Sequence, residues 1–129
     1  MTADQLNAIG AIILDSAITV HRILGPGLLE SAYQRAMTIE LRLRGLKVAC
    51  EVPVHFLYKG HDLGKTYEVD ILVEDEIIIE CKSVAAIIPN HKAQLITHLK
   101  LKDLHLGYLI NFNVPRVKDG FHRVVHHFA

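Results

Sequence analysis

Three charged residues stand inside an apolar stretch near the middle of the chain, and their types suggest chemistry. Within residues 68–83, Asp70 precedes the letters ILV, and Glu80 and Lys82 flank Cys81 at the end of IIIECK. Charged side chains are costly to bury unless they are paired or hold a metal ion. Because side chains alternate along a strand, Glu80 and Lys82 share one face and Cys81 points to the other.

The turn between the two apolar halves decides whether the two carboxylates meet. If the letters EDE at 74–76 form a three-residue loop, Asp70 falls directly opposite Glu80, with about 5 Å between their Cβ atoms. A two-residue loop would shift the register and turn Glu80 to the other face. We expect the three-residue loop, with Asp70, Glu80 and the amine of Lys82 converging on one pocket.

Two carboxylates this close repel each other unless a proton or a cation lies between them. Oxygen ligands of this kind, completed by water, suit Mg²⁺ or Mn²⁺. Lys82 could orient an attacking water molecule or stabilise charge that builds up on a phosphate. The alternative from spacing alone is an ion pair between an acidic residue and Lys82 at a sheet edge.

The elements that must position these residues follow from periodicity. Apolar residues recur every three or four positions through 3–24, which predicts an amphipathic helix that Gly25-Pro26-Gly27 stops. A second helix is expected over 28–44, with Gly45 at its end. The remaining segments indicate three strands at 46–60, 65–73 and 77–84, and then a helix at 91–102. Two further strands are expected at 104–113 and 121–128.

Local signals refine these boundaries. The letters GHDLG at 60–64 predict the turn of the first hairpin. Asn90 suits the N-cap of the third helix, with Pro89 just outside it. The expected fold is α/β, in the order α-α-β-β-β-α-β-β, with helices flanking a mixed sheet. Residues 71–81 are apolar on both faces, which indicates a central position in that sheet.

Composition bounds the class of protein. At 129 residues with 50% hydrophobic residues, the chain 1–129 is expected to be one globular domain. We find no secretory signal, and the apolar runs are too short to cross a bilayer. Cys50 and Cys81 form no metal-ligand pattern, so reduced thiols in a cytoplasmic protein are expected.

Charge is unevenly distributed although the formal net charge is zero. Residues 65–80 carry a local charge of −5, whereas residues 81–129 carry +5 and six of the nine histidines. A metal site beside a groove for a polyanion would need such a pattern. Clustered surface charge without a function is the other explanation.

The spacing D-x9-E-x-K of Asp70, Glu80 and Lys82 resembles the motif of the PD-(D/E)XK nuclease superfamily, whose fold is restriction-endonuclease-like. The segment GLLESAY, from Gly27 to Tyr33, also resembles the G-x-x-E-x-x-Y signature of the small bacterial GxxExxY family, assigned to that superfamily. The resemblance extends over nearly the whole chain, including ELRLRGLKV, HKAQLITHLKL and GYLINFNVP.

This resemblance implies a metal site with Mg²⁺ or Mn²⁺ as cofactor. Asp70 and Glu80 would bind the ion with the backbone carbonyl of Cys81. Glu30 would reach it through a water molecule or hold a second ion, and the simpler explanation of Glu30 is a carboxylate at a helix start. Lys82 would assist the attack, and Gln94 would position the substrate or Lys82.

Further residues are candidates for substrate contact. His98 takes the place of the tyrosine in the Gln-x-x-x-Tyr helix of RecB-like relatives, and it shares a helical face with His91 and Gln94. A solvated polar face is the alternative for His91. Tyr33 would orient Glu30 or serve as a core tyrosine. Other substrate contacts are expected from Lys92 and Lys100.

The function implied is metal-dependent hydrolysis of phosphodiester bonds in a nucleic acid, with DNA preferred and no membrane partner. The assemblies considered are a homodimer and a larger complex. The rival is a binding or regulatory module that keeps the nuclease fold without turnover. Intact carboxylates favour the enzyme, whereas the zero net charge favours the module.

Overall fold

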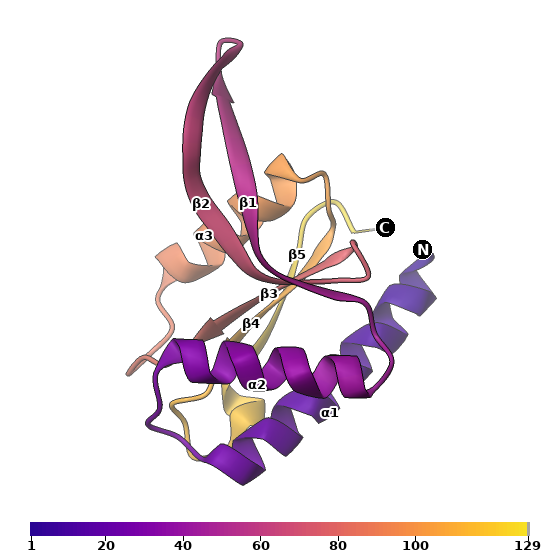
Figure 1. Cartoon of the computed structure of the whole chain (residues 1–129), viewed down its shortest axis with the longest axis vertical. Coiled ribbons are helices and arrows are strands. Elements are labelled where there is room, and N and C mark those ends of the chain that lie inside the picture. The colour runs from indigo at the N-terminus through magenta and orange to yellow at the C-terminus, as the bar shows by residue number, and fades with distance from the viewer. Residues whose placement is uncertain (129) are drawn as a thin grey trace.

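The chain forms a five-stranded mixed sheet with helices on both faces, in the predicted order of elements (Figure 1). The computed structural model describes residues 1–128, apart from the side chains at positions 65 and 66. The elements are α1 (Ala3–Leu24), α2 (Glu30–Leu43), β1 (Val48–Tyr58), β2 (His61–Val73), β3 (Ile77–Lys82), α3 (Pro89–Leu101), β4 (Leu106–Asn111), the short 3₁₀ helix η1 (Val117–Gly120) and β5 (Phe121–Val125).

The strands lie side by side in chain order, so β3 is central, as its apolar sequence predicts. The pair β3 and β4 is parallel, and the other three pairs are antiparallel. A parallel pair needs a crossover connection, and α3 supplies it between β3 and β4. The carboxyl ends of β3 and β4 therefore lie at the same edge of the sheet.

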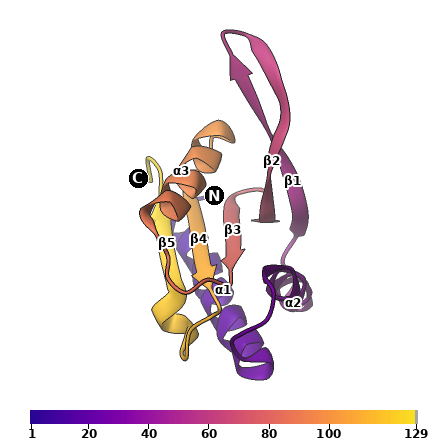
Figure 2. The same cartoon turned by 90° about the vertical axis from the view of Figure 1, so that its left-hand side faces the viewer.

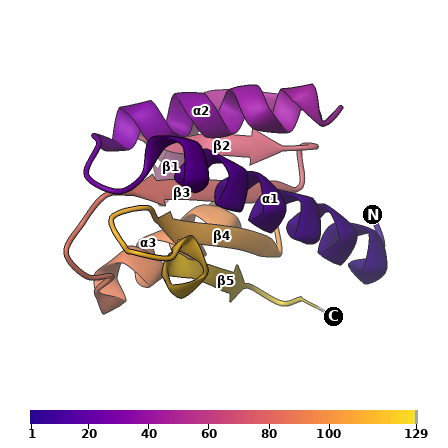
Figure 3. The same ribbon diagram turned by 90° about the horizontal axis from the view of Figure 1, so that it is seen from below.

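Two hydrophobic cores sandwich the sheet, one on each face. Figure 3 shows α1 and α2 on one side and α3 on the other. Ile13, Met37 and Ile79 are fully buried in the first core, and Ile78 and Leu99 are fully buried in the second. Alternate residues of β3 thus enter opposite cores, which explains why both of its faces are apolar.

Helix α1 begins with a capping box and ends as predicted. The Thr2 hydroxyl accepts from the N–H of Gln5 (3.1 Å), and the Gln5 side chain accepts from the N–H of Thr2 (2.8 Å). Contrary to the sequence expectation, α1 is long and apolar enough to cross a membrane by length and composition. This is weak evidence for a span, because Ile13 and Ala17 are fully buried in the core.

Two predicted boundaries are wrong, each for a local reason. The first hairpin turns at Lys59-Gly60 and not at 60–64, since both residues have positive φ (49° and 80°), as a tight two-residue turn requires. Helix α3 begins at Pro89 and not after Asn90. Proline suits the first helical position, where its missing N–H and preset φ cost nothing.

The β1–β2 hairpin projects beyond the rest of the molecule (Figures 1 and 2). Its strands change orientation near Asp70. Val69 packs in the core under α3, whereas Ile71 packs in the core under α1 and α2, although residues two apart on a regular strand share a face. Opposite this point, Glu51 has a positive φ of 51°. Asp70 therefore lies where the hairpin twists out of the sheet.

Candidate metal centre

The β2–β3 turn has the predicted register. Val73 pairs with Ile77 and Ile71 with Ile79, so Glu74, Asp75 and Glu76 form a three-residue loop. Glu74 and Asp75 have positive φ (52° and 57°). Continuing the same ladder by one residue sets Asp70 opposite Glu80.

The acidic loop is held by partners away from the candidate site. Lys47 donates from its N–H to Glu74 (2.6 Å) and from its amine to Asp75 (2.6 Å). The N-terminal amine lies 3.6 Å from Glu76. Half of the acidic residues in 65–80 thus stabilise a turn at the far end of β3. The local charge of −5 is a poorer guide to the site than the sequence suggested.

The Asp70 carboxylate faces the end of β3. Its Oδ2 accepts a hydrogen bond from the N–H of Cys81 (2.9 Å). The pKa of Asp70 is raised from 3.8 to about 7, first by burial and then by the neighbouring charge of Glu80, while the Cys81 N–H and Lys82 oppose the shift. The Glu80 carboxylate is therefore close enough to make ionisation of Asp70 more costly.

Glu80 is fixed by a histidine of α3. Its Oε1 lies 3.3 Å from Nδ1 of His98, and both side chains are largely buried, at 12% and 4% exposed. Because an ionised carboxylate can only accept, a His98 ring that bonds to the Glu80 carboxylate donates from Nδ1. The Tyr67 ring lies 6.0 Å from the His98 ring and packs against Phe56. The base of the hairpin thus holds the histidine that orients Glu80.

Glu80 and Cys81 divide between the two faces as predicted, with Glu80 against α3 and Cys81 in the opposite core. The Cys81 side chain is buried in the α1–α2 core, where its thiol pKa is raised by burial and by the carboxylates of Asp70, Glu80 and Glu30. Lys82 is half-buried, and among the described residues its amine makes no hydrogen bond or ion pair. The ion pair at a sheet edge, the alternative raised by the sequence, is therefore absent from this part of the chain.

Glu30 approaches the same strand end from the other side of the sheet. It is the first residue of α2, and its Oε2 accepts from the N–H of Ser83 (3.2 Å). The Ser83 hydroxyl donates to the carbonyl of Leu28 (2.6 Å). These contacts tie the start of α2 to the residue that follows β3, and they bring a third carboxylate to its carboxyl end.

Tyr33 holds the loop that precedes Glu30. Its hydroxyl donates to the carbonyl of Gly25 (2.5 Å) and accepts from the N–H of Leu28 (3.2 Å). The ring is fully buried and stacks on Phe112 with 4.4 Å between ring centroids. Tyr33 is thus a core tyrosine with a satisfied hydroxyl, which was one of the two alternatives from the sequence. Its hydrogen bonds to the loop also help to set where α2 begins at Glu30.

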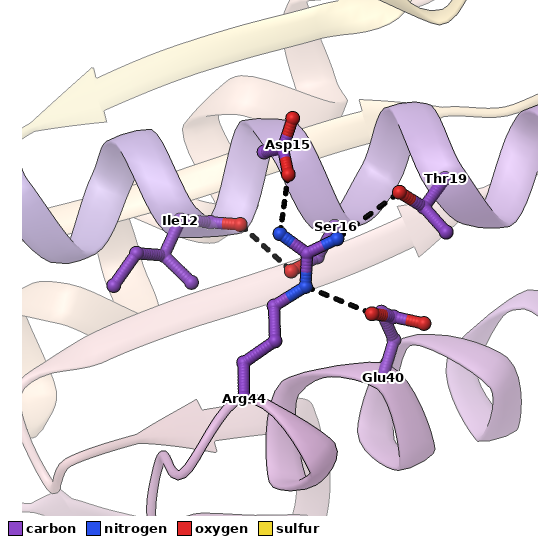
Figure 4. Close-up of polar contacts among 6 residues, drawn as sticks. All are labelled: Ile12, Asp15, Ser16, Thr19, Glu40 and Arg44. Carbon is purple, nitrogen blue, oxygen red and sulfur yellow. Dashed lines mark hydrogen bonds and ion pairs between the residues drawn. The ribbon is translucent and has the colours of Figure 1, made fainter.

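An arginine at the end of α2 opposite Glu30 bridges the two helices (Figure 4). Arg44, just past α2, pairs with Asp15 of α1 and with Glu40 of α2 (2.8 Å), and it donates to Thr19 (3.0 Å). The pKa of Arg44 is raised by its hydrogen bonds to Asp15 and Glu40. The bridge sets α2 against α1 and thereby supports the position of Glu30.

A family model for the PD-(D/E)XK nuclease superfamily matches residues 7–124. The chain belongs to this superfamily. The match includes all or most of every helix and strand, and the mixed α/β architecture is consistent with the restriction-endonuclease-like fold. Searches of curated proteins and of solved structures gave no match.

Nucleases of the PD-(D/E)XK superfamily generally use divalent metal ions, and the donors at this strand end fit one. The pKa of Asp70 is raised by burial and by the charge of Glu80, and a bound cation would counter both. A strand residue's N–H and C=O point to the same side, so the Cys81 carbonyl faces Asp70. No three His, Cys, Asp or Glu side chains cluster as ready-made ligands within the described chain, so water would complete the shell.

The remaining candidates from the nuclease motif lie on α3, with different environments. His98 is buried against Glu80, whereas Gln94 is exposed one turn earlier. His91 turns back, and its Nδ1 accepts from the N–H of Ile88 (3.1 Å) at the start of α3. Lys92 and Lys100 are exposed on the same helix. The structure thus brings His98, but not His91, into contact with the carboxylate pair.

Sequence reasoning missed residues that support the candidate site. Asn111, at the carboxyl end of β4, is 2% exposed, accepts from the N–H of Val84 (3.1 Å) and donates to its carbonyl (3.0 Å). A polar residue at the end of the apolar strand LGYLIN was the available signal. The sequence gives no such signal for Ser83 or Tyr67. Only the fold places Ser83 beside Glu30 and Tyr67 beside His98.

Proposed function

We propose that this domain is a Mg²⁺- or Mn²⁺-dependent nuclease that hydrolyses phosphodiester bonds, with DNA as the favoured substrate. The observation that carries the proposal is the pair of Asp70 and Glu80, two opposed carboxylates at the end of the central strand. The pKa of Asp70 is raised by burial and by the charge of Glu80, and a cation bound between the two carboxylates would offset both effects.

Different residues of the site would have different roles. Asp70, Glu80 and the Cys81 carbonyl would hold the metal, and His98 would keep the Glu80 carboxylate in its binding orientation. A bound divalent ion supplies a Lewis acid that polarises the phosphate and favours the attacking hydroxide. Lys82, whose amine makes no hydrogen bond or ion pair within the described chain, would stabilise negative charge on the phosphate.

Glu30 and Gln94 would complete the site from opposite sides. Glu30 lies at the same strand end, where its carboxylate would hold a water molecule or a second ion. Gln94 is exposed on α3 and would contact the substrate. Gly27, Glu30 and Tyr33 match the GxxExxY signature, and the hydrogen bonds of Tyr33 support membership of that smaller group.

The test is a cleavage assay with purified protein. Single-stranded, duplex and branched DNA and a matched RNA are incubated with Mg²⁺ or Mn²⁺. Wild type should cleave at least one of them, and Asp70→Ala and Lys82→Ala should abolish cleavage. Glu76→Gln is the matched control, because Glu76 lies in the same hairpin but faces the N-terminal amine. It should cleave like wild type.

The rival, a nucleic-acid-binding module without turnover, makes the opposite prediction. One observation favours it over a purely structural role: the exposed lysines of α3 offer a surface to a polyanion even without catalysis. If wild type binds nucleic acid and cleaves none of the substrates with either metal, the module replaces the nuclease as the proposed function.

A further inference from the structure

A basic pocket that the proposed chemistry does not use lies at the carboxyl-terminal end of α1. Its volume is about 290 Å³. Four of its six lining residues are basic and none is acidic: Ile18, His21, Arg22, Arg116, Val117 and Lys118. The pocket joins α1 to η1, two elements far apart in the sequence.

The cations of this pocket lack counter-charges. The side chains of Arg22, Arg116 and Lys118 are exposed, and in the part of the chain that the structure describes none makes an ion pair or hydrogen bond. Arg44 and Lys47, by contrast, are each paired with acidic residues. Gathering three unpaired cations costs repulsion, which a bound anion would relieve.

The floor of the pocket is held rigidly. His21 is 9% exposed, and its Nε2 lies 2.8 Å from the carbonyl of Val114. Val117 is buried, and η1 packs so closely on β4 that a Cβ atom at Gly120 would lie 2.1 Å from the Asn111 carbonyl oxygen. A site that is already formed loses little entropy when it binds a ligand.

The pocket shares a connecting segment with the candidate metal centre. The N–H of Phe112 donates to the carbonyl of Lys82 (2.9 Å), and Asn111 bonds to Val84 in both directions. Two residues later the same segment reaches His21 through Val114. Both sites therefore lie along the edge where β3 and β4 end; Figure 3 shows α1, β4 and the segment after it together.

We propose that this pocket binds a backbone phosphate of the nucleic acid, next to the phosphodiester that meets Asp70 and Glu80. That the ligand is a nucleic acid rests on the proposed nuclease function. That the pocket favours a phosphate anion follows from its own basic residues. The guanidinium groups of Arg22 and Arg116 have the planar donor geometry that suits phosphate oxygens. The substrate then runs along the strand ends to α1, in addition to any contact with α3.

The first test measures oligonucleotide binding in Mg²⁺ on an Asp70→Asn background, which prevents cleavage. Arg116→Gln should weaken binding several-fold at low salt and lower the slope of log affinity against log salt by about one. Arg35→Gln is the matched control. Arg35 is exposed on α2, and its substitution removes the same charge outside the pocket. It should leave affinity and slope unchanged.

The second test uses inorganic phosphate and protein NMR. Phosphate should shift the amide signals of residues 116–118 in wild type and not in Arg116→Gln. If oligonucleotide binds and Arg116→Gln matches wild type in affinity and slope, the pocket proposal is overturned while the nuclease proposal stands. If no oligonucleotide binds but phosphate shifts these signals only in wild type, the phosphate site stands and the nuclease proposal fails.

Discussion

At the scale of single residues, the raised pKa of Asp70 makes the stability of the fold depend on pH. Its folded-state value, about 7, lies above its ordinary value of 3.8 because of burial and Glu80. Between these two values the folded carboxyl keeps a proton that the unfolded chain has lost. The free energy of unfolding therefore falls as the pH rises across this window, and this cost is fully present above about pH 7.

The first prediction follows from this fall in the free energy of unfolding with rising pH. Without metal, Asp70→Asn should be more stable than wild type at pH 8, and the difference should shrink towards pH 4 in urea denaturation. Millimolar Mn²⁺ should raise the melting temperature of wild type and much less that of Asp70→Asn. Equal shifts in both proteins would place the ion elsewhere.

The second prediction concerns His98, which acts through Glu80. His98→Leu removes the hydrogen bond at similar volume and should weaken Mn²⁺ binding about tenfold in calorimetric titration. His98→Asn keeps a donor near the position of Nδ1 and should recover most of the affinity. If both variants bind Mn²⁺ as wild type does, His98 serves only to fill the core.

At the scale of elements, the site depends on how α2 is held against α1. Glu30 can reach Ser83 only if α2 begins at the end of β3, and Arg44 bridges the opposite end of α2 to α1 (Figure 4). The Arg44 side chain is 25% exposed, so solvent screens its ion pairs and each contributes modestly.

The third prediction is a drop of about 1 kcal/mol in unfolding free energy for Arg44→Met, measured by urea denaturation. The stabilising effect of Arg44 should also weaken at high salt, because its partner Asp15 is largely exposed. Arg35→Met on the same helix makes no such bridge and should change stability by less than about 0.5 kcal/mol. A similar drop in both variants would mean that helix composition matters, and not the bridge.

At the scale of the whole molecule, the net charge is zero but the charges are unevenly distributed. Acidic residues of the 74–76 loop are neutralised by Lys47 and the N-terminal amine, whereas lysines of α3 and the basic pocket at η1 remain exposed. Nucleic acid would therefore meet unpaired positive charge on two sides of the carboxylate pair, although the total charge is balanced.

The fourth prediction separates binding from chemistry on this surface. Lys92→Gln with Lys100→Gln should weaken nucleic-acid binding and flatten its salt dependence by roughly one unit for each phosphate that the variant no longer neutralises. Lys82→Ala should bind nearly as wild type and fail to cleave, since Lys82 is assigned to the chemical step. Unchanged salt dependence in the double variant would remove α3 from the binding surface.

The sequence by itself determined the order of the elements, the central place of β3 and the register of its hairpin. These features depend on local patterns: a two-residue alternation, a helical period, and a loop whose length sets which residues face each other. Asp70, Glu80 and Lys82 could therefore be placed together from spacing, and the superfamily match is consistent with that placement.

Only the tertiary structure decided which distant residues support this pair. His98 and Gln94 occupy the same helical face in sequence, yet packing buries one against Glu80 and leaves the other exposed. The Lys47 amine pairs with Asp75, 28 residues away, and Val114 contacts His21 across 93 positions. Such contacts arise because chain segments meet to bury apolar surface, and no local pattern records which polar groups that burial brings together.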